Sequence, residues 1–302
     1  MAGKISALHS FNTLTAGSYT YGVFVTNTGI LNIGSSDDAL QAEDEVFLEN
    51  LKGEELAENT PSEIIGGRNA VVFHVNGGVM EPGVFTVRDA VVSTMPEDIV
   101  SEYGNEMDFD LDSYLLSPVK FGESWFYMEN CLGSLITTRS HGGVISFEEG
   151  AELKPSNGVL VQTLVGYDSD AGAIYHDSTD TRVLADVTVN IDAPVAGDIL
   201  HQDYQRNMFL HVNADYDGRV TTGSITAWNE LWSVDGLAAL LAQGGHTQDF
   251  ELSPDAVANI RSCLVREEDT AAYTDVFGVT MDIASGADWT VEGESSVLRL
   301  TL

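Results

Sequence analysis

The chain has 302 residues, of which 47 are acidic and 13 are lysine or arginine, so its formal net charge at pH 7 is −34. This charge repels phosphate backbones and anionic lipid headgroups, which excludes nucleic acids and membrane surfaces as partners. Hydrophobic residues make up 43% of the sequence, as in a globular protein. No apolar run is long enough for a membrane span or a signal peptide. The sequence as written therefore predicts a cytoplasmic protein, although a processed secreted or cell-surface protein would look the same.

The N-terminal half predicts pairs of short strands joined by a glycine-containing corner. The pairs run through residues 23–33, 72–79 and, in a looser copy, 135–147. Apolar and polar residues alternate along them, which indicates strands with one buried face. Glycine supplies the backbone conformations that a sharp corner needs.

A second strand template repeats in the C-terminal half, at Val187–Ile191, Met208–Val212 and Val279–Ile283. The first two copies begin 21 residues apart. Another short strand is predicted six residues after the end of each copy, beginning at Gly197, Gly218 and Trp289.

Short strands, tight corners and this period predict an all-β fold, a parallel β-helix whose rungs stack about 4.8 Å apart. A single domain over 1–302, with about 21 residues in each rung, would hold about a dozen rungs. Parallel stacking would place Val189 against Leu210 and Ile191 against Val212. An antiparallel sandwich is the alternative, but it needs hairpin turns that are scarce here.

Residues 229–276 predict a helical insertion in this coil. Leu237, Leu240 and Leu241 belong to an apolar stripe at helical spacing, and Ser253-Pro254-Asp255 has the composition of a helix start. A rung has no place for a helix, so the insertion should cover one corner from outside.

The closing run from Val279 to Leu300, with Trp289-Thr-Val291 and Gly293, resembles the C-terminal rungs of right-handed parallel β-helix proteins. These are the adhesin-like proteins of gut bacteria, with relatives in fungi. The likeness covers about 157–229 and 277–302 and implies the handedness of the fold, while it implies little about activity. The chain departs from that family in its short length, its missing export signal and its insertion.

Three segments lead into the second template in successive rungs: residues 166–186, residues 201–207 and the insertion. They should emerge at one corner and form a pocket under the insertion, since they share a strand position. The candidate catalytic residues there are His201, His176, Asp203, Tyr204, Arg206, Tyr175 and Asp177. The candidate substrate-binding residues are Trp228, Trp232, His211, Tyr167 and Arg182.

These residue types suit acid–base chemistry near neutral pH. A carboxylate next to a histidine orients the ring and raises its pKa, as expected for the His176–Asp177 and His201–Asp203 pairs. The sequence therefore predicts an enzyme of isomerase, cyclase or lyase/dehydratase type acting on a small hydrophobic or aromatic molecule, with His201 as the best single candidate. The alternative for these residues is that they cap strand ends.

A non-catalytic function is the second hypothesis. An adhesin-like surface protein would bind glycans or protein partners along the open flank of the coil, where Thr188 and Asn190 belong to ladders of polar side chains. Export of the native protein would distinguish it from the enzyme. Among partners, the sequence leaves open a homodimer through the insertion or an end rung.

Metal ions and cofactors have little support in the sequence. Asp168, Asp170, Asp215 and Asp217 resemble fragments of calcium loops, but none extends to a complete motif. Zinc-ligand spacing and nucleotide-binding motifs are absent, so we expect no cofactor. The high acidity fits a solvated surface or a saline habitat, with cation binding as the alternative.

Overall fold

The computed structural model describes residues 4–7, 21–26, 29–34, 62–66, 69–74, 82–94, 134–139, 141–155, 157–164, 185–203, 206–222 and 278–302. Regular structure within these ranges consists of β-strands. They contain no helix, so a membrane-spanning helix is not found among them. The predicted helical insertion at 229–276 lies outside these ranges.

The strands form four sheets, here named A to D, and neighbouring strands within each sheet run parallel. The predicted all-β class is therefore confirmed for the described residues. Sheet A contains β1 (Lys4–Ala7), β4 (Ser62–Gly66), β7 (Ala90–Thr94) and β10 (Glu152–Lys154). Sheet B contains β2 (Tyr21–Thr26), β5 (Asn69–His74), β8 (Ile136–Arg139), β11 (Val159–Leu164), β14 (Asp198–His201) and β17 (Val220–Thr221).

Sheet C is the longest and sheet D the shortest. Sheet C contains β3 (Ile30–Ile33), β6 (Gly83–Val87), β9 (Gly143–Phe147), β12 (Val187–Ile191), β15 (Met208–Val212), β18 (Val279–Ile283) and β20 (Arg299–Thr301). Sheet D contains β13 (Val195–Ala196), β16 (Tyr216–Asp217) and β19 (Trp289–Thr290).

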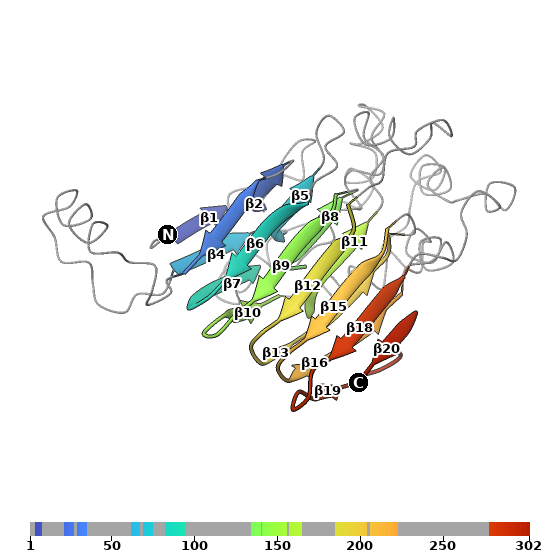
Figure 1. Cartoon of the computed structure of the whole chain (residues 1–302). Helices are drawn as coiled ribbons and strands as arrows, with labels where there is room; N and C mark the ends of the chain where they lie inside the picture. Colours follow the sequence, from blue (N-terminus) through green and yellow to red (C-terminus); the bar gives the residue numbers. More distant parts are fainter. Residues whose placement is uncertain are drawn as a thin grey trace, which may run out of the picture.

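The chain visits the sheets in a cyclic order, and we call one passage a rung. Each of the first six rungs crosses sheet A, or sheet D in the later rungs, then sheet B and then sheet C, while the last described rung goes from β19 in sheet D directly to β20 in sheet C. Strands from successive rungs lie side by side in Figure 1, so the colours advance steadily along the stack. Sheet C has seven strands, one from each rung in the described residues, where the sequence predicted about a dozen. The count was too high because it assumed that every rung has the same length. The connections in fact differ: residues 213–215 join β15 to β16, whereas residues 34–61 join β3 to β4.

The repeated strand template is in register in sheet C, as predicted. Val189 pairs with Leu210, and Leu210 pairs with Met281, all by parallel pairing of β12, β15 and β18. One predicted equivalence was wrong, because Trp289 aligns with Tyr216 in sheet D rather than with Gly218. The corner before β19 is two residues longer than the corner before β16, and this length shifts the alignment.

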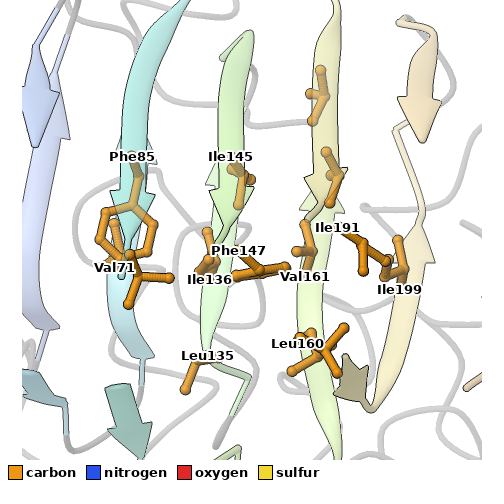
Figure 2. Close-up of a cluster of buried hydrophobic side chains, with 14 of the residues drawn as sticks. Val71, Phe85, Leu135, Ile136, Ile145, Phe147, Leu160, Val161, Ile191 and Ile199 are labelled. Atoms are coloured by element: carbon orange, nitrogen blue, oxygen red, sulfur yellow. The ribbon is translucent and has the colours of Figure 1, made fainter. Parts of the chain in front are cut away.

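The core lies inside the four sheets: sheets A and D contribute residues such as Val92 and Tyr216, and sheets B and C contribute in-register apolar columns. Figure 2 shows side chains from sheets B and C in this cluster. Sheet B contributes Val71, Ile136, Val161, Ile199 and Val220, and sheet C contributes Phe85, Ile145, Val189, Leu210 and Met281, all fully buried.

The two sheets differ on their outward sides. Buried and half-buried residues alternate along β6, β9, β12 and β15 of sheet C. In sheet B, Val72 and Leu200 are also buried, although the period of two places them on the side away from the core cluster, to which neither belongs. Sheet C is therefore open to solvent on one side, whereas much of sheet B is shielded on both.

Candidate functional site

The predicted common corner is the one at which the chain leaves a strand of sheet B and enters a strand of sheet C. The three connections in question join β11 to β12, β14 to β15 and β17 to β18. Their starting strands are neighbours in sheet B and their ending strands are neighbours in sheet C. The anchor points of the three segments are therefore stacked at one corner, as predicted.

His201 lies at this corner as the last residue of β14, and its side chain is fully buried. Its Nδ1 atom lies 2.6 Å from the hydroxyl oxygen of Thr163, and its Nε2 atom lies 3.0 Å from the carbonyl oxygen of Arg206. Because a carbonyl oxygen only accepts, Nε2 donates, and Nδ1 of the neutral ring accepts from the hydroxyl. Burial lowers the pKa of His201 to about 4, so the ring is neutral at pH 7. Sequence analysis expected a neighbouring carboxylate to raise the pKa of this ring, whereas burial lowers it.

Asp203 and Arg206 form a buried ion pair beside this histidine. An Arg206 guanidinium nitrogen donates to the Asp203 carboxylate over 2.6 Å, and both side chains are almost completely buried. Burial lowers the pKa of Arg206 to about 9, which still leaves it charged at pH 7. The predicted pairing of His201 with Asp203 is thus corrected: the ring is held by Thr163 and by the backbone of Arg206.

These contacts link residues at the two ends of the connection between β14 and β15. Arg206 holds Asp203 with its side chain and His201 with its carbonyl group, so one residue links both sides of the corner. Such contacts are typical of polar residues that cap strand ends, the alternative left open by the sequence.

A second candidate surface is the outward side of sheet C, where we define the polar column. It takes one polar residue from each of the seven strands, all in register and all accessible to solvent. Its members are Asn32, Thr86, Ser146, Asn190, His211, Asp282 and Thr301.

The polar column contains direct side-chain contacts between rungs. The Asn190 amide donates to the Ser146 hydroxyl over 3.0 Å. His211 Nδ1 lies 3.4 Å from an Asp282 carboxylate oxygen, and these side chains are 38% and 46% exposed. His211, predicted to bind substrate at the corner, therefore stands on the open side of sheet C.

The neighbouring outward column of sheet C is more apolar, and we call it the mixed column. It contains Ile30, Val84, Val144, Thr188, Phe209, Thr280 and Arg299, again in register across all seven strands. The two columns together form a continuous strip of accessible side chains along the sheet.

Two of the four calcium candidates lie in the described residues. Asp215 and Asp217 are exposed, and a carboxylate oxygen of Asp215 accepts from the backbone nitrogen of Asp288 over 3.2 Å. Within the described ranges, no group of three His, Cys, Asp or Glu residues could hold a metal ion.

The remaining predicted site residues lie outside the described ranges, so their roles and the pocket under the insertion stay predictions. These residues are His176, Tyr175, Asp177, Tyr204, Trp228, Trp232, Tyr167, Arg182, Asp168 and Asp170.

Sequence reasoning missed two features. Thr163 was not recognised as the partner of His201, because a register shift between Val159 and Val161 hides the alignment of β11 with β14. The extent of the polar column was also missed, although a signal existed: Asn190, His211 and Asp282 occupy the fourth position of the repeated template.

Comparisons with known proteins add no relative. A scan against protein-family models, a search of curated proteins and a search of solved structures found no match to this chain. The resemblance to adhesin-like β-helix proteins stays a prediction from the residues that carry it.

Proposed function

We propose that the chain is a right-handed parallel β-helix in a single domain, with a helical insertion at 229–276 over one corner. The cyclic order of the strands and their parallel pairing support this architecture. Right-handed crossover connections are strongly favoured between parallel strands, which supports the handedness.

We propose that the protein is a non-catalytic binding protein whose working surface is the outward side of sheet C. The observation that carries this function is the polar column, which offers a hydroxyl, amide, imidazole or carboxylate in every rung. Since neighbouring strands lie about 4.8 Å apart, the column presents hydrogen-bonding groups at a regular interval, which suits a linear ligand.

A glycan is the ligand that this strip fits best. Sugar hydroxyl groups can pair with the polar column, while Val84, Val144 and Phe209 of the mixed column offer apolar surface to the C–H faces of the sugar rings. The net charge of −34 disfavours polyanionic glycans, so the proposed ligand is a neutral or amino-bearing polysaccharide.

The test is retention of the protein on insoluble cellulose, starch and chitin. The double variant Asn190→Ala/His211→Ala removes two adjacent members of the polar column and should weaken binding by about tenfold or more, since each hydrogen bond contributes about 1 kcal/mol. Glu152→Ala, at an exposed position of β10 in sheet A, is the control and should bind as wild type. Wild type that is retained on none of these materials, or a double variant that binds equally well, would contradict the glycan proposal.

A cofactor-independent acid–base enzyme is the second candidate, acting on a small hydrophobic or aromatic molecule. The stacking of three connections at one corner, two of them longer than 20 residues, next to His201 and the Asp203–Arg206 pair, favours it. The two candidates make opposite predictions for His201→Ala. A proton-transfer residue would lose about 10²–10⁴-fold in turnover with an unchanged melting temperature. A capping residue would lose stability instead, and the saturated hydrogen bonds of the ring favour this second outcome.

A further inference from the structure

Exposed apolar side chains gather at the C-terminal end of the coil. Five large hydrophobic residues are exposed within the described ranges, and four of them lie in residues 291–302: Val291, Leu298, Leu300 and Leu302. Leu300 continues the buried column of sheet C, because it pairs with Met281. It is nevertheless 43% exposed, since β20 is the last strand of sheet C in the described residues. Among the described residues, the apolar column of sheet C is therefore exposed at β20.

The two long sheets end differently here. The edge of sheet B is closed, because the backbone nitrogens of Val220 and Thr222 donate to the hydroxyls of Ser295 and Ser296 over 3.1 and 2.8 Å. The edge of sheet C is not: β20 pairs with β18 on one side and with no other described strand. An open edge next to apolar side chains is a template for adding another strand.

The charge of this end also differs from the rest of the chain. The last eight residues, Ser295–Leu302, contain a single charged side chain, Arg299, and no aspartate or glutamate. In a chain with a net charge of −34, this segment adds no acidic side chain to the repulsion between two copies. Depletion of charge together with exposed apolar residues is typical of the centre of a protein interface.

We infer that this end is a homodimer interface, in which β20 pairs antiparallel with β20 of a second copy. A two-fold axis perpendicular to sheet C would join the two sheets and keep their core sides on the same face. Pairing centred on Leu300 places Leu300 against its own counterpart and Arg299 opposite Thr301, so the arrangement brings no like charges together.

Self-complementarity is the reason that the occupant is a second copy. A strand of three residues offers few hydrogen bonds, so a partner must also supply apolar side chains that meet Leu300. A second copy does so, because its own Leu300 continues the same apolar column of sheet C. The two-fold arrangement closes on itself, because both copies use the same edge of sheet C, that of β20. A head-to-tail contact of β20 with β3, the opposite edge of sheet C, would instead produce an open filament.

The experiment is sedimentation velocity of the full chain over a concentration series, in about 0.1 M and about 1 M salt. We expect the mass to rise from one copy to two and to stop there. Dimerisation should be stronger at high salt, because screening weakens the repulsion between two acidic copies while the apolar contact persists.

Leu300→Lys should raise the dissociation constant of the dimer by at least about tenfold, because it places two lysines at the centre of the contact. Ile30→Lys is the matched control: Ile30 is 71% exposed and lies on β3, at the other edge of the same sheet. It should leave the dimer unchanged, and equal melting temperatures would show that both variants fold. A chain that is monomeric at every concentration and salt, a dimer that tolerates Leu300→Lys, or polymers that Ile30→Lys abolishes would overturn the inference.

Discussion

Sheets B and C both line the core, but their outward sides differ: that of sheet C is accessible to solvent, whereas that of sheet B is largely shielded. In sheet C the outward residues are polar or mixed and half-exposed, as in β12 and β15. In sheet B the outward position of β11 is Gln162, which is completely buried. Of these two sheets, sheet C is therefore the one whose described outward residues are accessible along the whole sheet.

Several polar side chains that are buried in or beside sheet B are satisfied by protein partners. The Ser134 hydroxyl donates to the Gln162 side-chain oxygen over 3.2 Å, and the Gln162 amide donates to Gln202 over 2.7 Å. The Asn69 amide donates to the Thr137 hydroxyl over 3.1 Å. On the outward side of sheet C, water can form hydrogen bonds with such groups. In the proposed function, a ligand would displace this water from the polar column.

The largest expected effect is a difference in stability between substitutions on the two sides of β15 in sheet C. Leu210→Asp should lower the free energy of unfolding by about 4 kcal/mol or more, because it buries an unpaired carboxylate in the core column. His211→Asn, the next residue on the open side, should change it by less than about 0.5 kcal/mol. Urea unfolding of both variants measures the difference, and equal stabilities would mean that the register of β15 is wrong by one residue.

The second prediction compares outward positions of the two sheets directly. Gln162→Lys in sheet B should destabilise by about 2–4 kcal/mol, because it buries a charge and removes two hydrogen bonds. Asn190→Lys in sheet C should cost less than about 1 kcal/mol, since a lysine there reaches solvent. If thermal or urea unfolding gave similar losses for the two, the outward sides of the sheets would not differ as described.

The smallest effect concerns pH and the corner between the two sheets. Burial lowers the folded-state pKa of His201 from 6.5 to about 4, so between these values the unfolded chain binds a proton that the folded chain does not. The stability linked to His201 is therefore fully present above pH 6.5 and is lost as the pH falls towards 4, by at most about 3 kcal/mol.

His201→Gln removes this titration, so its unfolding free energy should fall less steeply than that of wild type between pH 6.5 and 4. Urea midpoints at pH intervals across this range provide the measurement. Parallel pH profiles for the two proteins would show that His201 is not held neutral in the folded chain.

Sequence reasoning succeeded where burial follows a local pattern. Val187–Ile191, Met208–Val212 and Val279–Ile283 were recognised and aligned correctly, because each alternates between core and solvent. It failed where distant segments decide the environment. The partner of His201 is Thr163 from the preceding rung, 38 residues away, whereas proximity in sequence favoured Asp203.

For the described residues, the sequence by itself determined the all-β class, the parallel stacking and the core side of sheet C, because apolar and polar residues alternate wherever one side of a strand is buried. Only the tertiary structure decided that Gln162 is buried on the outward side of sheet B and that Asp203 pairs with Arg206. It also decided that polar residues from seven rungs align on sheet C. The physical reason is that connections of unequal length separate the rungs, so their register comes from strand pairing and cannot be counted along the chain.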